Sequence, residues 1–136
     1  MVIEYQSENN ISVEEFRDVL LRSGLAERRP IDDHKRMEAM VCHSNLIITA
    51  RKNGELVGIA RAITDFEYCT YLSDLAVDTS FQRQGIGIEL IRRIKLQTPN
   101  AKLILLAAPA SVNYYPGIGM HRHNHCYILD DIADLI

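Results

Sequence analysis

The stretch Leu75-Ala76-Val77-Asp78-Thr79-Ser80-Phe81-Gln82-Arg83-Gln84-Gly85-Ile86-Gly87-Ile88-Glu89-Leu90 decides the fold expected for this chain. It begins as an apolar strand, crosses a short polar turn and enters a helix whose start carries two glycines. Gly85 and Gly87 remove side chains where a ligand could approach the backbone. The free N–H groups of a first helical turn form an anion site, to which Arg83 adds a positive charge. The pattern therefore predicts a strand–loop–helix phosphate cradle.

The two commonest phosphate-binding motifs do not fit this stretch. A P-loop needs a lysine directly after its last glycine, and none follows Gly85 or Gly87. A dinucleotide-binding fingerprint needs a third glycine near Leu90, which is absent. The alternative without a ligand is a helix that starts with two glycines so that it packs tightly against the sheet.

The run Gln82-Arg83-Gln84-Gly85-Ile86-Gly87 resembles motif A of the GNAT superfamily of N-acetyltransferases, Gln/Arg-x-x-Gly-x-Gly/Ala. The resemblance implies an α+β (three-layer α/β) fold with a mixed, mostly antiparallel sheet and helices on both faces. It implies acetyl-coenzyme A (acetyl-CoA) as co-substrate, with the pantetheine arm paired to the strand before the motif as an added strand. The cofactor-binding residues implied are Leu75, Ala76, Val77, Gln82, Arg83, Gln84, Gly85, Ile86, Gly87, Ile88, Asn113 and Tyr114.

Local signals predict the same order of elements along one domain of residues 1–136. Helices are expected after the capping box of Ser12 and Glu15, at the start marked by Pro30 with Asp32 and Asp33, at Gly85 and, as a short helix broken at Pro116-Gly117, over 111–115. Asn53-Gly54 indicates a two-residue hairpin turn, and Gly58 a bulge or a close backbone approach. The expected strands are 2–5, 46–51, 56–64, 71–77, 103–107 and, as one strand or a short hairpin, 120–129.

A second family-like patch, Tyr114-Tyr115 followed by Gly119-Met120, places Tyr115 where the family often has its general acid. A phenol with its ordinary pKa of about 10 is protonated at neutral pH and can donate to a leaving thiolate. One alternative is that Tyr115 only packs its ring against the core. The other is that Tyr114 is the acid instead. Asn113 would either bind the pantetheine arm or cap the short helix.

Asp74 is the candidate base, just before the motif strand. It could act through water, anchor a cationic amine or be a structural carboxylate. Strict alternation puts Tyr71 and Ser73 on the opposite face, and a bulge in this strand could bring either set toward the cleft.

Three histidines, His121, His123 and His125, alternate and would share one face of a strand. They could bind zinc, line the acceptor pocket or form a polar strand face, and we expect no metal. Because few residues follow Gly119 for the family's terminal hairpin, we expect a homodimer that completes it.

Composition limits the other function classes. With 136 residues and a net charge of −3, the chain lacks the basic balance of a nucleic-acid binder. It contains no apolar run long enough for a membrane span, no signal peptide over residues 1–6, and three scattered cysteines typical of a reduced cytoplasmic protein. The sequence thus predicts direct acetyl transfer in a ternary complex to a primary amine, a small molecule first and a protein amine second. The rivals are a non-catalytic acyl-CoA-binding module and a structural partner with a coincidental motif.

Overall fold

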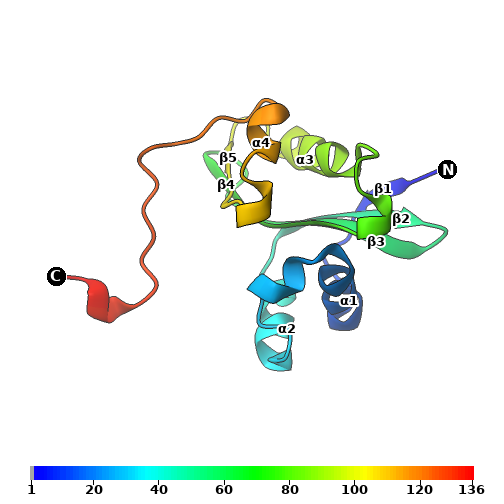
Figure 1. The fold of residues 1–136 in the computed structure, drawn as a ribbon, viewed down its shortest axis with the longest axis horizontal. Coiled ribbons are helices and arrows are strands. Elements are labelled where there is room, and N and C mark those ends of the chain that lie inside the picture. Colours follow the sequence, from blue (N-terminus) through cyan, green and yellow to red (C-terminus); the bar gives the residue numbers. More distant parts are fainter. Residues whose placement is uncertain (1) are drawn as a thin grey trace. The chain divides into compact units, whose positions relative to one another are not determined.

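A computed structural model describes residues 2–136, so that Met1 lies outside the described residues. The chain forms two compact units, of which the first ends at Leu106 and the second runs from Ala107 to Ile136. The regular elements of the first unit are β1 (Glu4–Ser7), α1 (Val13–Ser23), the 3-10 turn η1 (Leu25–Arg28), α2 (His34–Cys42), β2 (Leu46–Lys52), β3 (Glu55–Thr64), β4 (Cys69–Val77), η2 (Thr79–Phe81), α3 (Ile86–Gln97) and β5 (Lys102–Ile104) (Figure 1).

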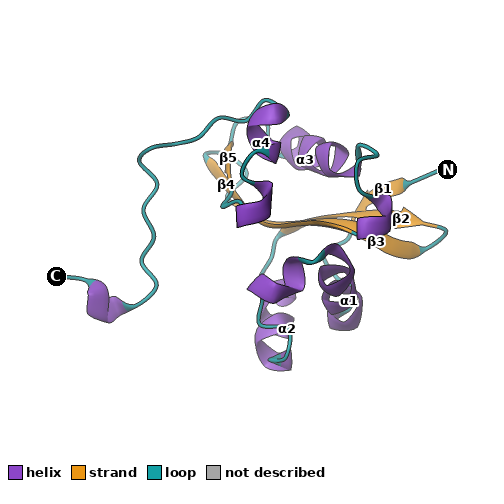
Figure 2. Cartoon of the chain, viewed as in Figure 1, coloured by secondary structure: helices purple, strands orange, loops and turns teal. Residues whose placement is uncertain are grey.

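The first unit is a five-stranded sheet with helices on both faces. The strand order is β1-β2-β3-β4-β5, with antiparallel pairs from β1 to β4 and a parallel β4–β5 pair. The helices α1 and α2 cover one face and α3 covers the other (Figure 2). The prediction of a mixed, mostly antiparallel sheet between helices is therefore confirmed.

Each face of the sheet buries its own apolar cluster, and both clusters form because the helices present apolar residues at helical spacing. Beneath α1 and α2 the fully buried side chains include Phe16, Leu20, Met37, Ile47 and Ile59. Beneath α3 they include Ile48, Ala60, Leu72, Leu90 and Ile94. The two clusters fix α1 and α3 on opposite sides of β4, the strand that leads into the motif.

The helix ends of the first unit follow their capping residues. The Ser12 hydroxyl accepts a hydrogen bond from the N–H of Glu15 at 3.0 Å, and Gly24 ends α1 at φ 86°. The second helix begins at His34 with Asp33 as its N-cap, at the end of the group Pro30, Asp32 and Asp33 that marks its start in the sequence. Pro30 opens a turn in which its carbonyl accepts from the N–H of Asp33, so that the helix starts only after the turn closes.

The β2–β3 hairpin has the turn that its sequence predicts. Asn53 and Gly54 adopt φ of 50° and 85°, the left-handed values of a two-residue turn, between the paired residues Lys52 and Glu55. Further along β3 the register shifts, because Gly58 pairs with Ala50 while Leu56 pairs with Arg51. The bulge expected at this glycine is thus present.

The second unit holds little regular structure: η3 (Pro109–Ser111), α4 (Tyr114–Gly117) and η4 (Ile132–Asp134). The short helix lies three residues later than predicted and contains Pro116 and Gly117, which were expected to break it. Pro116 is tolerated because the N–H groups of a first helical turn need no intrahelical acceptor.

The strand or hairpin predicted over 120–129 is wrong, because these residues form no strand. All side chains from His121 onward are exposed, and no strand pairs with this segment within its unit. The backbone groups of an extended segment without a partner strand bond to water. No inter-strand hydrogen bonds then hold the segment in a strand conformation. Within residues 2–136, no helix has the length and apolar character needed to cross a membrane.

Candidate active site

The start of α3 offers a row of free backbone donors. Gly85 is the N-cap of this helix at φ 84° and supplies no capping side chain. The first intrahelical bond runs from the N–H of Glu89 to the carbonyl of Gly85 at 3.1 Å. The N–H groups of Ile86, Gly87 and Ile88 therefore have no intrahelical acceptor. A Cβ placed on Gly85 would meet no atom within 4 Å, so the space beside this N-cap residue is open.

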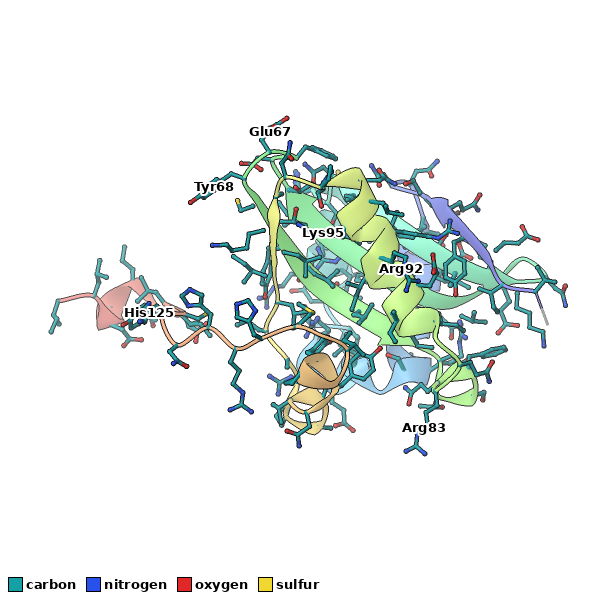
Figure 3. All side chains as sticks on the ribbon, turned by 90° about the horizontal axis from the view of Figure 1, so that it is seen from above. Glu67, Tyr68, Arg83, Arg92, Lys95 and His125 are labelled. Atoms are coloured by element: carbon teal, nitrogen blue, oxygen red, sulfur yellow. The ribbon has the colours of Figure 1, made fainter. Side chains whose placement is uncertain are left out.

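The loop before α3 adds further donors. Arg83 and Gly85 both have positive φ, 64° and 84°, and backbone of this kind forms concave anion-binding nests of successive N–H groups. Among the described residues, no acceptor is found for the N–H groups of Gln82 to Gly85. The Arg83 side chain, which forms no ion pair within residues 2–136, extends away from the loop (Figure 3). The loop and the helix start together make a positively polarised cradle of backbone donors.

Side chains around the cradle hold its loop in place. The Gln82 side-chain amide donates to the carbonyl of Val77 at 3.0 Å, which connects the loop to the end of β4. The Asp78 carboxylate accepts from the N–H of Ser80 at 2.8 Å and from Nη1 of Arg22 at 2.6 Å. Burial alone would raise the pKa of Asp78, yet these two donors hold that pKa below its usual value. Arg22 thereby ties the end of α1 to the beginning of the loop.

The strand that enters the cradle has a free edge. On one side β4 pairs with β3 as far as Val77, but on the other it pairs with β5 only over Cys69–Tyr71. Within residues 2–106, the segment from Leu72 to Val77 therefore has no strand on its second side. The unpaired N–H and C=O groups of such an edge can pair with the amides of an extended ligand. Leu75, Ala76 and Val77 lie in this strand directly before the cradle. Antiparallel alternation points the backbone groups of Leu75 and Val77 to the free edge, where the Val77 carbonyl already accepts from the Gln82 side chain.

A bulge marks the point where the free edge begins. Ala62 pairs with Leu72 while Arg61 pairs with Asp74, which leaves Ser73 as the extra residue. The bulge reverses the alternation of side chains: Leu72 packs in the α3 cluster, whereas Ala76 packs in the α1–α2 cluster. The bulge expected in this strand is confirmed, and it turns Asp74 toward α1 and α2.

The Asp74 carboxylate is fully buried and held between two arginines. Nε of Arg29 donates to one carboxylate oxygen at 2.5 Å, and Nε of Arg61 donates to the other. Neither oxygen is open to water or to an amine, and both compensate positive charges. This environment favours the structural alternative, with arginines as the partners, over the roles of base and amine anchor.

Sequence reasoning missed these two arginines. Arg61 is 4% exposed in the middle of an otherwise apolar strand, where a charged residue needs a buried partner. That placement was a signal for an internal carboxylate in the sheet. Arg29 gave no such signal, because it lies in a polar loop between two helices.

In the second unit, Tyr114 and Tyr115 pack edge to face with ring centroids 5.2 Å apart. Burial raises the pKa of both phenols, and Tyr114 raises that of Tyr115 further. Both therefore stay protonated at neutral pH, as a proton donor must. Asn113 occupies the N-cap position of α4, but its side chain makes no capping hydrogen bond, so the capping alternative is not supported.

The three histidines do not gather into a metal site. His123 and His125 pack edge to face at 5.3 Å, and Nδ1 of His123 accepts from the N–H of His125. Within residues 2–136, no three His, Cys, Asp or Glu side chains converge in a way that could hold a metal ion.

Comparison with known proteins defines the family. The model of the acetyltransferase (GNAT) domain matches residues 10–132, and the chain therefore belongs to this family. It is 28% identical over 97 residues to an uncharacterized N-acetyltransferase, ycf52, of Gracilaria tenuistipitata var. liui, a match that covers 68% of this chain and 53% of that protein. The chain thus matches about half the length of this curated relative.

Solved structures share the fold. A GNAT family acetyltransferase of Streptococcus pneumoniae superposes with a TM-score of 0.77 at 20% identity, covering 96% of this chain and 100% of its own. The aminoglycoside N-acetyltransferase AAC(6')-Iy, in complex with CoA, gives a TM-score of 0.73 at 17% identity, covering 96% and 95%. These likenesses establish the GNAT fold predicted from the motif.

Proposed function

We propose that this protein is an acetyl-CoA-dependent N-acetyltransferase that transfers an acetyl group directly to a primary amine in a ternary complex. The observation that carries the proposal is the continuity of two binding features: the free edge of β4 from Leu72 to Val77 leads through the loop into the cradle of backbone donors around Gly85. The edge suits an extended chain of amides, and the cradle suits a diphosphate.

The donors of the cradle fit a polyanion. The N–H groups from Gln82 to Ile88 are main-chain donors at a helix N-terminus, where negative charge is stabilised by the helix dipole. Arg83 adds a positively charged side chain to the same loop. In this proposal the pyrophosphate lies on these N–H groups and the pantetheine amides pair with β4 at Leu75 and Val77. Acetyl-CoA supplies the activated thioester.

Three tasks remain for the protein's own groups. Backbone N–H groups on the free edge of β4 stabilise the oxyanion that forms on the thioester carbonyl. The Tyr115 phenol, kept protonated by its raised pKa, gives a proton to the leaving thiolate. The third task is to remove a proton from the acceptor amine. We assign no side chain as this base, because Asp74 is committed to its two arginines, and in this proposal the proton passes to solvent water.

The acceptor in this proposal is a small molecule that carries a primary amine. One structural neighbour is described as an aminoglycoside N-acetyltransferase, and another structure of AAC(6')-Iy holds a bisubstrate analogue of CoA and acetylneamine. These neighbours support a small-molecule amine in preference to a protein amine.

The test is the thermal midpoint with and without acetyl-CoA for the wild type, Gly85→Glu and Gly24→Glu. Both glycines have nearly the same positive φ, 84° and 86°, and both have open space at Cβ, so Gly24→Glu is a matched control for backbone strain. At a hundredfold excess over its dissociation constant, a ligand that binds only the folded state stabilises by about 2.7 kcal/mol. We expect the wild type and Gly24→Glu to be stabilised and Gly85→Glu not.

No stabilisation of the wild type would overturn the proposal. Binding without release of CoA thiol across a panel of small amines and amine-bearing peptides would favour the non-catalytic acyl-CoA-binding module. Release with peptides alone would move the acceptor to a protein amine.

A further inference from the structure

The two arginines that hold Asp74 also hold the bulge. Nη2 of Arg29 donates to the carbonyl of Ser73 at 2.7 Å, and Nη2 of Arg61 donates to the Ser73 hydroxyl at 2.8 Å. Ser73 is the extra residue of the bulge, and its carbonyl and side chain are each bound by one guanidinium group. Asp74, fully buried behind them, fixes the orientation of both arginines.

The same arginines reach into the elements on the α1–α2 face. Nη1 of Arg61 donates to the carbonyl of Met40 at 3.1 Å and to the Ser44 hydroxyl at 3.0 Å, at the end of α2. Arg29 follows η1 and donates through Nη1 to the carbonyl of Arg28. The bulge is therefore connected to the helical layer by a network of directional hydrogen bonds.

We propose that Arg29 and Arg61 are positioning residues for the thioester: with Asp74 they fix the peptide unit at Ser73 and thereby aim the free edge of β4 at the acetyl carbonyl. The inference rests on the proposed function. A peptide unit is planar, so a guanidinium bound to the Ser73 carbonyl sets the orientation of the bond from Ser73 to Asp74. The direction in which Leu75 to Val77 leave the bulge follows from that orientation.

This role has a consequence that a merely structural role lacks. The part of the cofactor next to the bulge is the acetyl group, whereas the diphosphate and most of the pantetheine arm bind elsewhere. Loosening the bulge should therefore weaken binding of acetyl-CoA more than binding of CoA, which has no acetyl carbonyl. General destabilisation would weaken both ligands equally.

The experiment is calorimetric titration of the wild type, Arg29→Met and Arg17→Met with acetyl-CoA and with CoA. Arg17 is a matched control, because it donates to the carbonyl of Ile31 in the same inter-helix segment and, within residues 2–136, forms no hydrogen bond or ion pair with β4. For Arg29→Met we expect the preference for acetyl-CoA over CoA to fall by about threefold to tenfold, the range of one neutral hydrogen bond. CoA binding by Arg29→Met and both affinities of Arg17→Met should match the wild type.

A lysine at the same position separates charge from geometry. Lysine keeps the positive charge, but its ammonium cannot bind Asp74 and the Ser73 carbonyl in the fixed fork of a guanidinium. We expect Arg29→Lys to lose the acetyl-CoA preference as Arg29→Met does. Recovery of the wild-type preference by lysine would overturn the positioning role, because charge alone would then suffice.

An unchanged ratio of the two affinities in a folded Arg29→Met variant would also overturn the inference. Should that variant fail to fold, Ser73→Ala removes only the Arg61 contact and should lower the ratio in the same direction by a smaller factor; an unchanged ratio there has the same meaning. Wild-type protein that binds neither ligand would instead refute the proposed function itself.

Discussion

Gly58 of β3 lies directly against Ile86, the first residue of α3. A Cβ on Gly58 would stand 3.1 Å from Cγ2 of Ile86 and 3.3 Å from Cδ1 of Leu90, closer than side chains normally pack. The helix that carries the cradle therefore rests on the sheet at the one position of β3 that has no side chain. The close approach expected from the sequence is confirmed, and it sets the height of the N-terminus of α3 above the sheet.

Gly58→Ala should destabilise the fold by about 1–3 kcal/mol, because the added methyl group forces the start of α3 away from a well-packed sheet. Urea unfolding measures this loss. The matched variant Gly58→Ala/Ile86→Ala removes the facing side chain, and the two substitutions together should cost less than the sum of their separate effects. Additive losses would show that Gly58 and Ile86 do not compete for the same space.

Arg22→Met should loosen the cradle loop. Without the Arg22 guanidinium, the Asp78 carboxylate lacks its charged hydrogen-bond donor. This loss should cost about 1–3 kcal/mol of folding stability. Because Asp78 begins the loop, the dissociation constant for acetyl-CoA should rise as well. Asp18→Asn and Glu55→Gln change exposed partners of the same arginine and should leave both quantities near wild type. Equal effects from all three variants would contradict this account of the loop.

Lowering the pH should reduce the free energy of unfolding, because Glu8 becomes protonated. A hydrogen bond from Arg51 lowers the pKa of Glu8 from 4.5 to about 2, against an opposing effect of burial and with further help from Thr49. The folded pKa is below the unfolded one, so this carboxylate stabilises the fold above pH 4.5, and the stabilisation is lost as the pH falls toward 2. Urea unfolding between pH 6 and pH 2.5 should show a steeper loss for the wild type than for Glu8→Gln. Parallel pH profiles would show that Glu8 is not a source of the pH dependence.

Tyr115→Phe should lower the turnover of acetyl-CoA with its amine by about 10²-fold or more, the usual contribution of a general acid, and leave acetyl-CoA affinity within about twofold. Tyr114→Phe, the neighbouring phenol, serves as control and should retain its rate. Release of CoA thiol in single-turnover experiments measures the effect. A large loss for Tyr114→Phe with none for Tyr115→Phe would reassign the acid to Tyr114.

Much of the first unit was predictable because its signals are local. The capping residue Ser12, the turn Asn53-Gly54 and the glycine-rich start of α3 each act within about four residues of the chain. Gly58 in an apolar strand indicated both the bulge and the close approach that the structure contains. Motif A lies at a strand-to-helix junction, as its pattern predicts.

The features that depend on distant contacts were not predictable in this way. Arg29 meets Asp74 across 45 residues of sequence, and Asp74 alone looked equally suited to catalysis. The predicted strand over 120–129 fails for a related reason: alternation of side chains favours a strand only where another strand supplies hydrogen bonds. The expectations of a homodimer and of a cytoplasmic protein stay predictions.

The most direct test of the central claim is hydrogen exchange of backbone amides with and without acetyl-CoA, read at single residues by NMR. The account predicts slower exchange at the Leu75 and Val77 amides, which point to the free edge, and across the cradle from Gln82 to Ile88. Exchange at Ala76, whose amide faces β3, and at the N–H groups of α1 and α2 should be unchanged. Slowed exchange elsewhere with none at these two segments would contradict the placement of the cofactor along β4 and the start of α3.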